Sequence, residues 1–288
     1  MPRPAADFAD ASRRFAALAA RDGAAISVPG RSRLYAHGRR TPLAIVLYHG
    51  FTNAPEQWAQ FATAMHARGH TLVVPRLPGH GHADRSATEI ARVTRAQFLA
   101  TCSEAVDIAC GAGERVAVAG LSIGGAFALE LALARTDVDR TVAIVPFIGV
   151  ARLGATANAV LARVLRVAPN AFVPWDPGGK AGQTPPYAYP KFPTRTLGAA
   201  LESGGRAYRE ARDGAACGRT TLLLNAREPA CNNALSQTLA ARLERRRPGS
   251  CDIVVLDTLP ANHDIIDPHN PLARVDVVYP RLRELVEG

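Results

Sequence analysis

Short, continuous apolar runs alternate with longer stretches of helical spacing along most of this 288-residue chain. Because the runs lack polar residues at alternate positions, both faces of each strand should be covered, as in a mostly parallel sheet between helices. Residues 25–28 and 33–38 are candidates for an antiparallel hairpin at the sheet edge. The predicted buried strands are residues 43–49, 70–76, 115–120, 140–147, 220–225 and 251–257. The predicted helices are residues 54–69, 95–110, 236–247 and 271–286, with another after Ser122.

Residues 148–218 interrupt this alternation. They contain an amphipathic stretch, NAVLARVLRVA, then a segment rich in proline, glycine and aromatic residues, then a polar helical stretch, with no run typical of a buried strand. Long segments without regular structure are uncommon in compact domains, and those that occur are often functional. The sequence therefore predicts a core made of residues 1–147 and 219–288, with residues 148–218 inserted as a cap or lid.

The composition is that of a soluble globular protein with a sizeable core, since 48% of the residues are hydrophobic and 20% are charged. No apolar run approaches the roughly 20 residues that a membrane-spanning helix needs. The N-terminus also lacks the apolar region and cleavage site of a secretory signal. We therefore expect a cytoplasmic protein without stable membrane insertion.

The net charge of +9 comes almost entirely from arginine, because lysine occurs only at positions 180 and 191. Such a charge would suit nucleic acid or an anionic membrane. The arginines are spread along the chain, however, and the one dense run, residues 245–247, ends a predicted helix, where positive charge complements the helix dipole. Without a recognition motif or interleaved aromatic residues, nucleic-acid binding is not expected.

The cysteines are odd in number and widely spaced, with no CxxC pair. A disulfide framework or a zinc site is therefore not expected, and most of the cysteines are predicted to be small core residues. Nothing in the sequence indicates another metal or an organic cofactor, and nothing in it determines the oligomeric state. The cysteines are Cys102, Cys110, Cys217, Cys231 and Cys251.

Ser122 lies between a predicted strand and a predicted helix, in the sequence Gly120-Leu121-Ser122-Ile123-Gly124. Small residues around a serine at such a joint allow a tight turn that presents its hydroxyl at the carboxyl end of a sheet. The N-terminus of the following helix directs N–H groups and a positive dipole toward the same place. Ser122 is therefore the candidate nucleophile, although a serine that only caps the helix would need no catalysis.

His263 is the candidate base, because a serine hydroxyl is a poor nucleophile without one. It lies six residues after the last predicted strand, in the sequence LPANHDIIDP, on a loop at the same carboxyl edge as Ser122. His49 and His80 lie in glycine-rich turns near that edge and are competing candidates. The alternative for His263 is a loop histidine that caps the final helix.

Glu228 is the candidate acid, because the imidazole needs a partner that fixes its tautomer and stabilises its cation. It lies three residues past the predicted strand 220–225, on a loop expected to flank His263. The alternative for Glu228 is an ordinary surface carboxylate. Carboxylates on the histidine's own loop are competing acids, but their closeness in sequence makes an approach to the far ring nitrogen harder. These are Asp257, Asp264 and Asp267.

Two backbone N–H groups are candidates for an oxyanion hole, which would hold the oxygen of a tetrahedral intermediate. One belongs to Ile123, the residue after the serine. The other belongs to Phe51, in the sequence HGFT after the first buried strand, where Gly50 lets the chain turn. An ordinary tight turn is the alternative explanation of HGFT.

These blocks resemble, in the same order, the serine hydrolases of the α/β-hydrolase superfamily, in particular bacterial carboxylesterases and monoacylglycerol-lipase-like proteins. The resemblance rests on LYHGFTNAPEQW, VVPRLPGHG, VAGLSIGGAFALELA, and LLLNAREPACNN followed by NHDIIDP, and it covers about residues 43–268. It implies an eight-stranded, mostly parallel sheet, a cap after the sixth strand, and the catalytic order Ser122, Glu228, His263. Most relatives have aspartate in place of Glu228, and many have histidine in place of Leu121.

The resulting prediction is a serine esterase for small to medium-chain acyl esters that works through an acyl-enzyme intermediate. Dehalogenases and epoxide hydrolases of this superfamily use an aspartate nucleophile, and Ser122 argues against both. The same residues could instead serve thioester or carbon–carbon bond hydrolysis or perhydrolysis, or the fold could belong to a non-catalytic binding protein. Aromatic residues of the cap either line an acyl pocket or only pack the cap onto the core. The pocket candidates are Trp175, Tyr187 and Tyr189.

Overall fold

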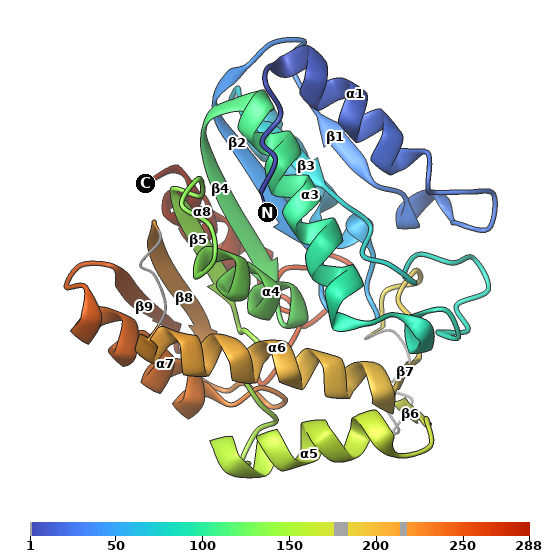
Figure 1. Ribbon diagram of the computed structural model, residues 1–288, viewed down its shortest axis with the longest axis vertical. Coiled ribbons are helices and arrows are strands. Elements are labelled where there is room, and N and C mark those ends of the chain that lie inside the picture. The colour runs from blue at the N-terminus through green and yellow to red at the C-terminus, as the bar shows by residue number, and fades with distance from the viewer. Residues whose placement is uncertain (1, 176–183, 214–217) are drawn as a thin grey trace.

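A seven-stranded sheet forms the centre of the computed structural model, which describes residues 2–175, 184–213 and 218–288 (Figure 1). The strand order is β1-β3-β2-β4-β5-β8-β9; β1 is antiparallel to β3, and all other neighbours are parallel. The predicted mostly parallel sheet is thus confirmed, and the carboxyl ends of its parallel strands share one edge. The strands are β1 (Arg33–Tyr35), β2 (Thr41–Tyr48), β3 (Thr71–Val74), β4 (Gly113–Leu121), β5 (Arg140–Ile144), β8 (Arg219–Asn225) and β9 (Cys251–Leu256).

The expected edge hairpin was wrong, and with it the count of eight strands for the part of the chain described. Ile26 makes only an isolated bridge with His82, and a 3-10 turn, η1 (Val28–Gly30), follows. Pro29 lies in this turn and has no N–H group to donate to a strand ladder. β1 alone joins the sheet, and its partner is β3 rather than the preceding segment.

Helices cover both faces of the sheet (Figure 1). Alternate side chains of β2 explain why residues 43–48 are all apolar: Val46 and Tyr48 join the core on one face, and Ile45 and Leu47 join the core on the other. The first face is covered by α1 (Phe8–Ala19), α3 (Arg95–Ala112), α4 (Ile123–Ala132) and α7 (Asn233–Arg246). The second is covered by η2 (Pro55–Trp58), α2 (Ala59–Ala67) and α8 (Val275–Glu287).

The chain leaves the sheet after β5 and returns at β8, and the intervening residues 148–175 and 184–213 are here called the cap segment. Its helices α5 (Ala155–Val167) and α6 (Thr194–Asp213) lie side by side beyond the carboxyl ends of β4 and β8 (Figure 1). Its strands β6 (Phe172–Pro174) and β7 (Lys191–Pro193) pair with each other and are largely exposed. The rest of the expected cap, residues 176–183 and 214–217, lies outside the described residues.

Two predictions from composition concern the cysteines and membrane-spanning helices. Cys102, Cys231 and Cys251 are buried, Cys110 is half-buried, and Cys217 lies outside the described residues. In the described part of the chain, no helix has both the length and the apolar character that a membrane span requires.

Candidate active site

Ser122 occupies a strained turn between β4 and α4. Its φ is +56° and its ψ −114°, a conformation that costs a residue with a side chain about 1–3 kcal/mol. The surrounding backbone holds it there: the Ser122 N–H donates to the Ile144 carbonyl at 2.9 Å, and the Phe147 N–H donates to the Ser122 carbonyl at 3.0 Å. The serine is therefore fixed at the carboxyl edge of the sheet, at the N-terminus of a buried helix.

The glycines on either side of Ser122 are required by close backbone contacts. A Cβ atom at Gly120 would lie 2.3 Å from the Gly124 carbonyl oxygen, and one at Gly124 would lie 2.5 Å from the Tyr48 carbonyl oxygen. Backbone atoms in the middle of a packed sheet and helix cannot move aside as a flexible side chain can. The spacing Gly120-x-Ser122-x-Gly124 thus follows from packing α4 directly against β4 and β2.

We expect Gly124→Ala to lower the free energy of unfolding by about 1–3 kcal/mol, the usual cost of overpacking a buried site. The reason is the contact of the new Cβ with the Tyr48 carbonyl. Denaturant unfolding followed by circular dichroism measures the effect. Gly23→Ala is the matched control, because an added Cβ there has no heavy atom within 4 Å. Equal stability of the two variants would show that the close approach at Gly124 is relaxed in solution.

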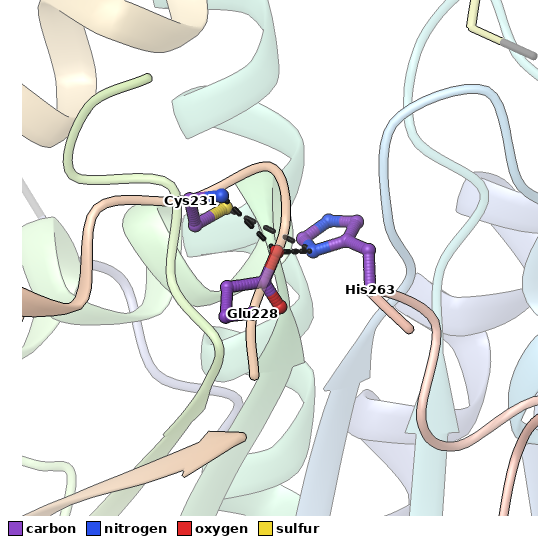
Figure 2. Close-up of side chains that lie close together, drawn as sticks. All are labelled: Glu228, Cys231 and His263. Atoms are coloured by element: carbon purple, nitrogen blue, oxygen red, sulfur yellow. Dashed lines mark hydrogen bonds and ion pairs between the residues drawn. The ribbon is translucent and has the colours of Figure 1, made fainter. Parts of the chain in front are cut away.

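His263 is hydrogen-bonded to Glu228. Its Nδ1 donates to Glu228 Oε1 at 2.8 Å, and the glutamate side chain is fully buried while that of His263 is 29% exposed (Figure 2). The same carboxylate oxygen accepts the backbone N–H groups of Ala230 at 2.8 Å and Cys231 at 3.1 Å. These three donors fix the carboxylate, and Nδ1 of His263 carries the proton that faces it, so Nε2 is the free base when the imidazole is neutral.

Asn225 joins the loops that carry these two residues. It is the last residue of β8, and its Nδ2 donates to the carbonyls of Pro260 at 2.9 Å and Asn262 at 2.8 Å, on the loop just before His263. Asn225 is not among the residues that the sequence predicts for the site. Its only signal in the sequence is a polar side chain at the end of an apolar strand, three residues before Glu228.

Cys231 connects the serine to this pair. Its Sγ lies 3.9 Å from His263 Nδ1. Burial raises the pKa of the Cys231 thiol, against the smaller, opposite effects of His263 and of a hydrogen bond from Ser122. Ser122 and His263 therefore both contact one thiol. Figure 2 shows Cys231, Glu228 and His263 converging from adjacent segments.

The same cluster holds three side chains of types that bind metals. The candidate ligand atoms of Glu228, Cys231 and His263 lie within 4.8 Å of one another. In the structure, however, the Glu228 carboxylate and the His263 Nδ1 bind each other directly. The contacts are those of a histidine oriented by an acid, and the expectation of a metal-free site stays a prediction.

The electrostatics of the pair favour a charged histidine. Burial alone would lower the pKa of His263, but the Glu228 carboxylate and Cys231 together outweigh it, and the pKa lies well above the ordinary value of 6.5. Burial alone would raise the pKa of Glu228, but the His263 charge and the hydrogen bonds to Oε1 lower it overall. An imidazolium formed at His263 is thus stabilised where it forms.

The competing histidines are buried in a different arrangement. His49 Nε2 accepts the Leu77 N–H at 3.1 Å, while its Nδ1 donates to the Gly50 carbonyl at 3.0 Å, so both of its nitrogens are used. Burial lowers the pKa of His49 to about 4 and that of His80 well below its ordinary value. The two rings pack edge to face, with centroids 4.9 Å apart. They are neutral core residues that brace the turns at this edge.

The competing acids are either exposed or hydrogen-bonded to other side chains. Asp257 is exposed. Asp264 accepts a hydrogen bond from the Gln57 side chain at 2.8 Å, and Asp267 accepts one from the Tyr187 hydroxyl at 2.6 Å. The acid that holds the histidine in the structure is therefore the one on the loop between β8 and α7.

The candidate oxyanion-hole groups come from two different elements. Phe51 is half-buried in the turn after β2, and Ile123 is the buried first residue of α4. Within the described ranges, neither backbone N–H has a hydrogen-bond partner. Unpaired backbone N–H donors of this kind could serve an anionic oxygen.

The aromatic candidates of the cap segment contact the core or one another. Tyr187 is buried and donates to Asp267 at 2.6 Å, and the buried Tyr189 donates to the Gly79 carbonyl at 3.2 Å. Trp175 is 39% exposed, and its indole N–H donates to the Tyr189 carbonyl at 2.9 Å. These contacts pack the cap segment onto the core, and a role for the three residues in substrate binding stays a prediction.

Comparisons with known proteins point to one family. The sequence model of the "Alpha/beta hydrolase family" matches residues 45–277. Over 98 residues, the chain is 33% identical to the thermostable monoacylglycerol lipase of Bacillus sp. (strain H-257). That match covers 34% of this chain and 38% of the lipase, so it spans less than half of either protein.

Solved structures of other proteins have a fold similar to that of this chain. One is a structure of the metagenome-derived lipolytic enzymes LipS and LipT, with a TM-score of 0.71 and 16% identity over 91% of this chain and 99% of that chain. Another is a soluble variant of monoglyceride lipase from Saccharomyces cerevisiae, with a TM-score of 0.71 and 12% identity over 89% and 91% of the two chains. Likeness at such low identity concerns the fold alone. Because the family match extends over most of the sequence, the chain belongs to the alpha/beta hydrolase family.

Proposed function

We propose that this protein is a serine hydrolase of carboxylic esters with small to medium-length acyl chains. The observation that carries the proposal is the strained Ser122 turn beside a histidine that a buried glutamate orients. Membership of the alpha/beta hydrolase family supports it, as does the partial similarity to a monoacylglycerol lipase. Catalysis would need Ser122, His263 and Glu228 together.

In the proposed acylation step, Nε2 of His263 takes the proton of the Ser122 hydroxyl, and the serine oxygen attacks the ester carbonyl carbon. The carbonyl oxygen becomes an oxyanion that the backbone N–H groups of Phe51 and Ile123 hold. The carbon–oxygen bond to the alcohol then breaks, and the alcohol leaves with the proton that His263 had taken. An acyl group remains on Ser122.

In the proposed deacylation step, His263 takes a proton from water, and the resulting hydroxide attacks the acyl carbon. The second tetrahedral intermediate uses the same two N–H groups. The bond to the serine oxygen breaks, that oxygen regains a proton from His263, and the carboxylic acid is released. Glu228 stays ionised throughout and stabilises the imidazolium in both steps.

The test of the proposal is hydrolysis of p-nitrophenyl esters with acyl chains from acetyl to palmitoyl. We expect turnover that is highest for the shorter and medium chains, together with labelling of the protein by a fluorophosphonate, which reacts rapidly only with an activated serine. Absence of both turnover and labelling across the series would contradict the proposal.

The rate of ester hydrolysis should rise with pH and have its midpoint above 6.5. Only neutral His263 can accept the serine proton, so the rate is low below the pKa of His263 and increases as the pH passes through it. Glu228 raises that pKa, which places the rise on the alkaline side of an ordinary histidine. Measuring kcat/KM for one ester from acidic to alkaline pH gives the midpoint. A flat profile between pH 5 and 8 would argue against His263 as the base.

A further inference from the structure

Asp264, next to His263 in sequence, lies between two loops of the site. Its Oδ2 accepts a hydrogen bond from Gln57 Nε2 at 2.8 Å and another from Asn53 Nδ2 at 3.0 Å. Its Oδ1 accepts the backbone N–H groups of Asp267 at 3.2 Å and Ile266 at 3.4 Å. Both carboxylate oxygens therefore face donors only, an arrangement that an ionised side chain satisfies.

Gln57 extends this contact to the turn that carries Phe51. Its Oε1 accepts the Gly50 N–H at 2.8 Å, while its Nε2 donates to Asp264. Gln57 is buried, so water does not compete for these bonds. The Gly50 carbonyl in turn accepts the Asn53 N–H at 3.2 Å, and Asn53 also binds Asp264. Two hydrogen-bonded paths thus run from one carboxylate to the two ends of the turn.

The ionised carboxylate of Asp264 is energetically unfavourable at this desolvated position. Burial and the neighbouring charge of Asp267 raise the pKa of Asp264 to about 7. An ionised group that is desolvated beside a like charge destabilises a fold unless its donors compensate. Such a group, in contact with a candidate catalytic loop, is a candidate for a functional role.

We propose that Asp264 is a positioning residue, whose carboxylate holds the turn bearing the Phe51 N–H in register with His263 through Gln57 and Asn53. The inference rests on the proposed ester hydrolysis. It assigns to Asp264 no contact with substrate. Its effect passes through the two amide side chains, which fix where the Phe51 N–H points.

Asp264→Asn should lower kcat about ten- to hundredfold while KM changes less than about twofold, because an oxyanion-hole donor acts mainly in the transition state. The new amide places an N–H₂ group against donors that the carboxylate had accepted. Fluorophosphonate labelling should slow with kcat, because the phosphonyl oxygen uses the same N–H groups. Unchanged kcat in a folded Asp264→Asn protein would overturn the proposal.

The double variant Gln57→Glu with Asp264→Asn is the decisive test of the path through Gln57. The introduced glutamate can accept the Gly50 N–H with one oxygen and the introduced asparagine amide with the other, so the direction of the hydrogen bond is reversed and the path is kept. We expect each single variant to lose activity, since Gln57→Glu alone opposes two carboxylates, and the double variant to recover at least tenfold over either. A double variant as impaired as the worse single variant would show that the path through Gln57 does not matter.

Two further variants distinguish a failure of the positioning role from a failure of the proposed function. Asp257→Asn changes an exposed carboxylate on the same β9–α8 connection and should leave kcat and KM unchanged. Asn53→Ala removes one of the two side-chain donors to Asp264 and should lower kcat by a smaller factor. This variant tests the proposal even if Asp264→Asn does not fold. An unchanged kcat in Asn53→Ala counts against the proposal. If the unmodified protein hydrolyses no ester, the proposed function fails. If it does and these variants match it, only the positioning role fails.

Discussion

Ser122→Ala should abolish ester hydrolysis, with kcat lower by about four to six orders of magnitude. The reason is that the variant leaves no hydroxyl in the strained turn between β4 and α4, so the proposed base His263 has no serine proton to take. The residual rate would come from the oxyanion hole and from substrate binding alone. The measurement is turnover of the preferred p-nitrophenyl ester by both proteins at the pH optimum, with fluorophosphonate labelling alongside.

Ser236→Ala is the matched control for this prediction. Ser236 is also buried, but it lies in α7, where its hydroxyl donates to the Asn232 carbonyl at 3.3 Å. We expect full activity and full labelling in this variant. Turnover that survives in Ser122→Ala at more than about one part in a thousand of the original would exclude Ser122 as the nucleophile. The alternatives would then be a different reaction or a binding role for the fold.

The sequence predicts those parts of the structure in which the residue pattern of a segment reflects the burial of that segment alone. The central runs of β2, β4 and β8, residues 43–48, 116–121 and 222–224, are apolar because both of their faces are covered, so their pattern alone indicates a sheet between helices. Ser122 is recognisable because an added Cβ atom at either of two nearby glycines would lie only 2.3 or 2.5 Å from a backbone carbonyl oxygen. Both signals are local, and both can be found without knowing the fold.

The contacts that the sequence does not predict join segments far apart in the chain. The hydrogen bond between Gln57 and Asp264 spans 207 positions, and nothing near either residue marks the other as its partner. Asn225 likewise reaches 37 positions ahead to the Asn262 carbonyl. The edge hairpin failed for another reason: Ile26 bridges His82 and the Ser27 N–H donates to the Gly81 carbonyl, so this segment pairs with a distant loop and not with residues 33–38. Long-range polar pairing and edge geometry depend on the assembled sheet.

Glu228→Gln should reduce kcat by a factor of about 10² to 10⁴ and shift the rise in rate to lower pH. The amide keeps the shape of the side chain but removes the charge that raises the pKa of His263. Its N–H₂ group can also donate to Nδ1, which favours the tautomer whose proton sits on Nε2 and cannot serve as a base. The two effects are separable, because kcat at the pH optimum reports the tautomer and the midpoint of the pH profile reports the charge.

Glu228→Asp is the informative comparison, because it keeps the charge and shortens the side chain by one methylene group. The carboxylate of Glu228 is fixed by the N–H groups of Ala230 and Cys231, and the glutamate length lets the same oxygen reach His263 at 2.8 Å. The aspartate must give up either the backbone donors or the histidine, so we expect an intermediate kcat with a midpoint closer to that of the unmodified protein. If instead Glu228→Gln left both kcat and the pH profile unchanged, the hydrogen bond to His263 would be structural, and Glu228 would not be the acid that assists catalysis.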